Sequence, residues 1–261
     1  MPQLSTERTR RAIVEHTRRM AEAAAAAGPG AAVPTTPKWT VTGLVEHLGQ
    51  TQNWVAEIIE RRIADPTRLP TEMAALPDDP AEWPAWLSAS AQRVADACSD
   101  DAIDAPVFNA AGDERTGTRF WMSSMLNEAV VHGFDAANAA GLPPDVEPDV
   151  AAALIDNHFK MLTSPTWEMQ RPESAQAIRG TGQTLLWTAT DTDAGWFVER
   201  HPEGAAWRPG TGDADATVSG PAGSLLLSLT RRIPLASNGI EVFGDAGVVE
   251  HWIGNTAHDA G

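Results

Sequence analysis

The stretch Phe120-Trp-Met-Ser-Ser-Met-Leu-Asn-Glu-Ala-Val-Val-His-Gly-Phe-Asp135 has the pattern of a helix that is buried and yet carries ionisable groups. At helical spacing, one stripe of this stretch holds Trp121, Met125, Glu128, His132 and Asp135. A solvated helix face rarely carries Trp and Met, and an inward face carries ionisable groups only when they are paired or bind something. The stretch therefore predicts a helix with a polar site on its inward face.

Glu128 and His132 are four residues apart, so their side chains leave the same face of a helix and can converge on one ion. Taken alone, such a pair is also typical of an ordinary solvated helix face. A second histidine, His47, lies about eighty residues earlier in another helical pattern. Two imidazoles and one carboxylate form a ligand set that, around zinc, leaves one coordination position open for water or a thiolate.

The segment around His47 reads as the start of a helix. Thr40 is the expected N-cap, and Trp39 is placed to pack against Leu44 as a hydrophobic staple. His47 borders the apolar face of this helix, where a histidine bonded to a neighbouring helix is the simpler interpretation. The glutamate–histidine pair on the other helix favours a metal ligand instead.

These two segments, Thr36-Pro-Lys-Trp-Thr-Val-Thr-Gly-Leu-Val-Glu-His-Leu-Gly49 and Glu128-Ala-Val-Val-His-Gly-Phe-Asp-Ala136, resemble the metal-binding domain of the mycothiol-dependent maleylpyruvate isomerases. That family is a branch of the DinB-like helical bundle superfamily. Residues 215–234 and 240–246 are similar to the small α/β domain that follows the bundle in those enzymes. Two positions depart from the family pattern: Gly43 replaces an acidic residue, and Arg231 replaces a glycine before the family's arginine.

The resemblance implies a function and assigns roles to residues. His47, Glu128 and His132 are expected to hold a divalent cation, with Zn²⁺ as the expected ion, and mycothiol is expected as thiol cofactor or co-substrate. In the scheme that the resemblance implies, the cation lowers the pKa of a coordinated thiol and the thiolate adds to the double bond of the electrophile. The bond becomes single and rotates, and elimination of the thiolate gives the trans isomer. Arg232 is expected as the carboxylate-binding or catalytic arginine. Arg231 is its rival, and a solvated charge at a helix C-terminus is the structural alternative.

Composition limits the classes of function. The chain of 261 residues has a formal net charge of -16, which makes nucleic acid a poor partner. It has no apolar run of about 18 residues and no recognisable signal peptide, so neither a membrane nor export is expected and the cytoplasm is the default location. The single cysteine, Cys98, excludes an intramolecular disulfide and is expected to be a small buried residue, so a reacting thiol would come from outside the chain.

The periodicity predicts an α+β protein made of a four-helix bundle, at residues 1–168, and a small α+β domain, at residues 169–261. The expected bundle helices are Ser5–Ala27, Thr40–Ala64, one that starts near Asp79 or Pro84, and one that ends at Gly141. A further helix, 149–162, closes the bundle or bridges to the next domain. Strands are expected at 184–190, 195–200 and 240–243, and helices at 221–231 and from Asp245.

Other functions remain open at this stage. Bundles with the same ligands transfer mycothiol to other electrophiles, so isomerase and S-transferase are not separated by these motifs. A thiol-independent metalloenzyme, a non-catalytic metal-binding protein and a carrier of an apolar ligand are further alternatives, the last because the C-terminal part resembles sterol-carrier-like folds. The small-molecule electrophile, further cofactor-binding residues and the oligomeric state are not determined by the sequence.

Overall fold

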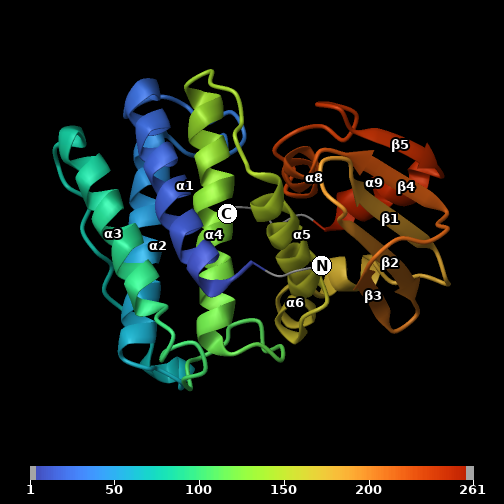
Figure 1. Ribbon diagram of the computed structural model, residues 1–261, viewed down its shortest axis with the longest axis horizontal. Helices are drawn as coiled ribbons and strands as arrows, with labels where there is room; N and C mark the ends of the chain where they lie inside the picture. Colours follow the sequence, from blue (N-terminus) through green and yellow to red (C-terminus); the bar gives the residue numbers. More distant parts are fainter. Residues whose placement is uncertain (1–3, 257–261) are drawn as a thin grey trace. The chain divides into compact units, whose positions relative to one another are not determined.

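The computed structural model describes residues 4–256 and consists of two compact units (Figure 1). The first unit, Ser5–Asp145, is helical. The second holds Leu4 and the chain from Val146 on, and combines helices with one mixed sheet. The predicted α+β class, with a helical domain before an α+β domain, is confirmed.

Four long helices make up the first unit: α1 (Thr6–Ala27), α2 (Val41–Glu60), α3 (Trp83–Ala97) and α4 (Gly117–Ala139). Helix α1 packs against the other three, and α2 also packs against α3 and α4. Two short 3-10 helices, η1 (Pro66–Arg68) and η2 (Pro80–Glu82), lie between α2 and α3. This arrangement places α2 beside α4, the two helices that carry the predicted ligands.

The ends of these helices follow local signals. Ser5 caps α1 by accepting a hydrogen bond from the backbone N–H of Arg8, and Thr40 caps α2 through the N–H of Gly43. The prediction that the second helix runs to Ala64 was wrong. Helix α2 ends at Glu60 because Arg62 takes the left-handed conformation, with φ of 50°, so the chain turns before Ile63. Pro84 does shift the start of α3, which begins at Trp83.

A buried polar network joins three helices of this unit. The side chain of Gln52, on α2, is fully buried and donates to Thr17 Oγ1 of α1 at 2.7 Å. Ser90 Oγ of α3 donates to the side-chain oxygen Oε1 of the same Gln52 at 2.6 Å. Because each buried polar group has a partner, the network fixes how the three helices pack without leaving an unpaired dipole.

The second unit begins with α5 (Pro148–Leu162), α6 (Pro165–Gln170) and α7 (Pro172–Ala177). Its strands are β1 (Thr184–Ala189), β2 (Gly195–His201), β3 (Gly204–Pro209), β4 (Ala216–Gly220) and β5 (Glu241–Gly244). Helix α8 (Ala222–Leu229) connects β4 to β5, and α9 (Ala246–Asn255) follows β5. The sheet order is β3-β2-β1-β4-β5, with β1 and β4 parallel and the other pairs antiparallel.

One face of the sheet forms the core of the second unit. Trp187 of β1 stands opposite Trp196 of β2 and Val218 of β4, and all three side chains are fully buried. Helices α8 and α9 contact β4, and α8 also contacts β1. In residues 4–256 no helix is both long and apolar enough to cross a bilayer.

The two units divide at Asp145 and Val146, earlier than the expected boundary at 168/169. The difference comes from α5, which the sequence assigned to the bundle or to a bridge. In the structure α5 packs against α8, and its Asp156 accepts a 2.6 Å hydrogen bond from the indole of Trp196. These contacts make α5 part of the second unit.

Candidate metal centre

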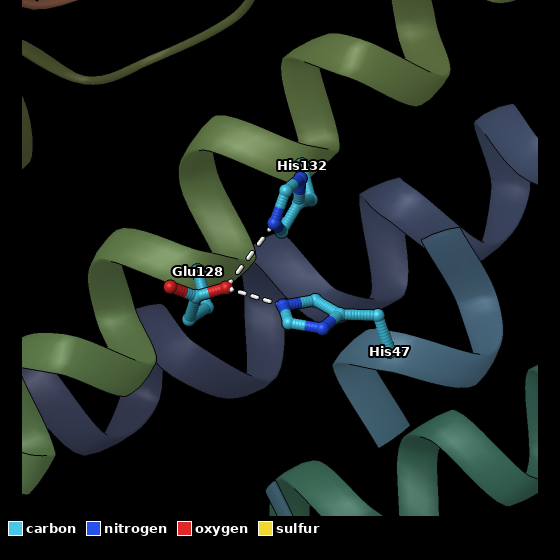
Figure 2. Close-up of side chains that lie close together, drawn as sticks. All are labelled: His47, Glu128 and His132. Atoms are coloured by element: carbon cyan, nitrogen blue, oxygen red, sulfur yellow. Dashed lines mark hydrogen bonds and ion pairs between the residues drawn. The ribbon is translucent and has the colours of Figure 1, made fainter. Parts of the chain in front are cut away.

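The side chains of His47, Glu128 and His132 meet between α2 and α4 (Figure 2). Glu128 Oε2 lies 2.9 Å from His47 Nε2 and 3.1 Å from His132 Nε2. One donor atom from each residue lies within 4.8 Å of the other two. The structure therefore brings together all three residues that the sequence selected as ligands.

Each donor is positioned by its helix. Glu128 and His132 stand one turn apart on α4, and His47 lies in the second turn of α2, after the cap at Thr40. The side chain of His132 is only 7% exposed, whereas those of Glu128 and His47 are 28% and 36% exposed. The site is thus closed on the His132 side and open to solvent on the other.

The donor set fits a divalent cation. Metal bonds of about 2.0–2.1 Å in a tetrahedron place neighbouring donors about 3.3 Å apart, close to the distances from Glu128 Oε2 to the two imidazole nitrogens. Imidazole and carboxylate ligands suit Zn²⁺ and related transition metals. Three protein donors on one side of a partly open site leave room for an exchangeable ligand.

The same groups also influence one another's protonation. Burial lowers the pKa of His132, but hydrogen bonds to Asp135 and Glu128 outweigh that effect and raise the pKa to about 9. Burial raises the pKa of Glu128, but hydrogen bonds from His132 and His47 outweigh it and hold this carboxyl well below its usual pKa. Glu128 is therefore ionised at neutral pH and available as a ligand.

Three further residues surround the histidines, two in direct contact and one through Asp135. Asp135 Oδ2 lies 2.9 Å from His132 Nδ1, and Asp135 Oδ1 accepts a 2.6 Å hydrogen bond from Thr35. The indole of Trp39 is stacked near His132, with ring centroids 5.6 Å apart, and meets His47 edge-on at 5.0 Å. Trp39 also packs on the core cluster that contains Leu44, as the predicted staple requires.

Sequence reasoning placed Asp135 on the inward stripe without giving it a role, and it did not single out Thr35. The His-x-x-Asp spacing of His132 and Asp135 is the signal that could have identified the first, since residues three apart on a helix are neighbours. Nothing in the sequence around Thr35 points to a partner one hundred residues away.

The two candidate arginines belong to the second unit and make different contacts. Arg231 donates to the carbonyls of Ile253 and Gly254 at the end of α9, so it caps that helix. Arg232 is half-buried, and its guanidinium donates to the carbonyl of Thr230 at 2.9 Å. Arg231, the alternative to Arg232, thus has a structural role in capping α9.

The single cysteine and two tryptophans of the helical unit have structural surroundings. Cys98 is fully buried, and desolvation raises the pKa of its thiol to about 12. Trp54 and Trp121 meet edge-to-face with centroids 5.4 Å apart, and their indole N–H groups donate to the carbonyls of Pro70 and Phe108. These partners account for both tryptophans as structural residues of the bundle.

The chain is a two-domain protein: a helical domain carries the candidate metal centre, and an α+β domain with a mixed five-stranded sheet follows it. The family described as "Mycothiol maleylpyruvate isomerase N-terminal domain" matches residues 10–137, and the "MDMPI C-terminal domain" matches residues 145–251. The chain belongs to the mycothiol-dependent maleylpyruvate isomerase family.

Solved structures agree with this assignment at the level of the fold. The crystal structure of the mycothiol-dependent maleylpyruvate isomerase is 16% identical to this chain with a TM-score of 0.57, and the match covers 93% of this chain and 95% of that one. A histidine-to-alanine mutant of that isomerase is 15% identical with a TM-score of 0.58, over the same shares of the two chains. No curated protein matches this sequence significantly.

Proposed function

We propose that this protein is a metal-dependent and mycothiol-dependent isomerase that acts on a maleylpyruvate-like electrophile, an unsaturated oxo-acid with a cis double bond. The observation that carries the proposal is the meeting of His47, Glu128 and His132 at a partly open site. Membership in the mycothiol-dependent maleylpyruvate isomerase family supports mycothiol as the thiol and a maleylpyruvate-like compound as the substrate.

A divalent cation on these donors would lower the pKa of a thiol at the open position, so that thiolate is present at neutral pH. Glu128 contributes the negative charge of the site, and its low pKa keeps that charge in place. The His132 side chain lies on the closed side of the site and is nearly buried, whereas the His47 side chain lies on the side that is open to solvent. The exposed side is where a thiol and a substrate can approach.

The protein's own cysteine does not serve as the thiol in this proposal. Cys98 is buried on the helical unit's interior, and a thiol with a pKa of about 12 is almost entirely protonated at neutral pH. The reacting sulfur therefore comes from a small-molecule thiol, which in this family is mycothiol.

Arg232 is proposed as the residue that binds a carboxylate of the substrate. A planar guanidinium makes two parallel hydrogen bonds to a carboxylate, which suits a dicarboxylate or an oxo-acid. Arg232 is preferred because it is the position that resembles the family's arginine, and its neighbour Arg231 donates to two backbone carbonyls at the end of α9.

Metal analysis of purified protein tests the proposal. Wild type is expected to contain about one divalent cation per chain, and His132→Ala is expected to lose it. His201→Ala is the matched control, since His201 is a partly exposed histidine of β2. Full metal content in His132→Ala would refute the assignment of the site.

The reaction itself is tested with mycothiol and maleylpyruvate. Formation of the trans isomer, with mycothiol regenerated, supports isomerisation. Accumulation of a stable thioether would instead show transfer of the thiol to the electrophile, and turnover without any thiol would show a thiol-independent metalloenzyme.

A further inference from the structure

The contacts behind His132 carry an inference that rests on the proposed function and adds to it. We propose that Asp135 and Thr35 are positioning residues that hold the His132 ring in the tautomer and orientation needed to bind a cation through Nε2. Asp135 lies next to His132 on α4, while Thr35 comes from the loop between α1 and α2.

The burial of Asp135 argues for this role. Its side chain is fully buried in the interior of the helical unit, where a carboxylate is costly unless each oxygen has a hydrogen-bond partner. Both oxygens are engaged: Oδ1 with the hydroxyl of Thr35 at 2.6 Å and Oδ2 with His132 Nδ1 at 2.9 Å. An apolar residue would fill the same space at lower cost, so the carboxylate is better explained by what it does to the histidine.

The hydrogen bond to Nδ1 decides which nitrogen faces the candidate metal centre. A carboxylate accepts hydrogen bonds, so Asp135 keeps the proton of a neutral His132 ring on Nδ1. The lone pair is then on Nε2, which lies 3.1 Å from Glu128 Oε2. Without this contact the neutral ring could carry its proton on Nε2 and present no donor to a cation.

Thr35 is itself held by a well-defined loop. Backbone hydrogen bonds from Val33 to Trp39, from Thr36 to Val33 and from Trp39 to Thr36 close this loop on itself. The same loop places the Trp39 indole in a stacked position near His132. A segment about one hundred residues away in the sequence therefore supports the histidine both through Asp135 and through direct ring packing.

The loop also offers a matched pair of threonines for a test. Thr35 donates to Asp135, whereas the hydroxyl of its neighbour Thr36 is buried without a hydrogen-bond partner among residues 4–256. Thr35→Val and Thr36→Val make the same chemical change at adjacent positions, but only the first removes a contact to the carboxylate.

The experiment measures zinc affinity by competition with a chelator in the full-length protein. Asp135→Asn and Thr35→Val are expected to weaken zinc binding by about 10–100-fold and about tenfold, in the range typical of groups that orient a metal-binding histidine. Thr36→Val and Thr35→Ser, which keeps the hydroxyl, are expected to bind zinc like wild type. Circular dichroism of each zinc-free variant checks that it is folded.

A spectroscopic measurement separates positioning from a general loss of structure. In the zinc-loaded wild type, the Nδ1–H proton of His132 is expected to appear as a ring resonance protected from exchange with water, because it is hydrogen-bonded to a buried carboxylate. The same resonance is expected in Thr36→Val, and faster exchange is expected in Thr35→Val and Asp135→Asn.

Failure of the metal site and failure of the positioning role give different results in these variants. If His132→Ala binds zinc as tightly as wild type, the metal site is wrong and the inference fails with it. If His132→Ala loses zinc while Thr35→Val and Asp135→Asn keep wild-type affinity and exchange, the metal site stands and the positioning role is refuted.

Discussion

His132 Nδ1 lies 2.9 Å from Asp135 Oδ2, while the other ring nitrogen of His132 lies 3.1 Å from Glu128 Oε2. The imidazole is therefore held at both nitrogens by carboxylates three residues ahead and four residues behind it on the same helix. A ring fixed in this way loses little freedom when a cation binds, which is how a protein prepares a metal site before the metal arrives.

The protonation of His132 predicts how the stability of the metal-free protein depends on pH. Folding raises the pKa of His132 from 6.5 to about 9, so this contribution to stability is fully present below pH 6.5 and is lost as the pH rises through 9. We expect the melting temperature of zinc-free protein to fall over this range. Differential scanning calorimetry of wild type and of His132→Gln measures it, and an equal fall in both proteins would exclude His132 as the cause.

Metal binding should show the opposite trend with pH. Because a proton occupies His132 below pH 9, a cation must displace that proton when it binds. Zinc affinity is therefore expected to rise between pH 6.5 and 9, and calorimetry in buffers of different ionisation enthalpy should show release of about one proton per cation at pH 7.5. Affinity independent of pH would be inconsistent with His132 as a ligand.

Cys98 is expected to be dispensable for turnover. Its buried thiol has a pKa of about 12, so native protein should react with thiol reagents only as fast as it unfolds. Cys98→Ala should keep most of the mycothiol-dependent activity and lose about 1 kcal/mol of stability from the small change in packing. Loss of all turnover in a folded Cys98→Ala variant would instead make Cys98 the nucleophile.

The neighbouring arginines should respond differently to the same substitution. Arg232→Lys is expected to lower kcat/KM by at least about tenfold with unchanged metal content, because lysine lacks the planar fork that pairs with a carboxylate. Arg231→Lys should lower the melting temperature, since Arg231 caps α9, and should leave kcat/KM close to wild type. Equal kcat/KM for wild type and Arg232→Lys would contradict a carboxylate-binding role and favour the structural alternative, a charge at the C-terminus of a helix.

The buried network around Gln52 gives a prediction about the bundle alone. Gln52→Ala removes the donor to the buried Thr17 hydroxyl, and a buried group left unpaired costs about 1–3 kcal/mol. Ser90 loses one acceptor and keeps the carbonyl of Leu87 at 2.9 Å. A clear drop in the urea midpoint is expected. Gln50→Ala is the control. Gln50 is half-buried, and within residues 4–256 its side-chain amide donates to Glu46 on the same helix. Similar midpoints for both variants would show that the network adds nothing to stability.

The sequence predicted the parts of the site that depend on local spacing. Glu128 and His132 were identified because four residues bring two side chains to one helix face. The cap and staple predicted the start of the His47 helix, and the glutamate–histidine pair on the other helix favoured His47 as a third ligand. Thr35 was not identified, since its contact with Asp135 depends on how a loop packs against a distant helix.

The same distinction holds for the fold. Helix α5 was expected from its periodicity, but its place in the second unit depends on contacts with α8 and Trp196, which no local pattern contains. Strands β3 and β4 were not singled out, and β3 lies at the sheet edge with side chains that are exposed or half-buried, so it lacks clear alternation.

The most direct test of thiol activation by the metal is the absorption spectrum of cobalt-substituted protein titrated with mycothiol. If His47, Glu128 and His132 hold the cation and leave a position open, mycothiol should bind as a thiolate and produce a sulfur-to-cobalt charge-transfer band. The band should saturate at about one thiol per cobalt and should be absent in His132→Ala. A cobalt-loaded wild type that turns over substrate with mycothiol and shows no such band would contradict the claim that the metal activates the thiol.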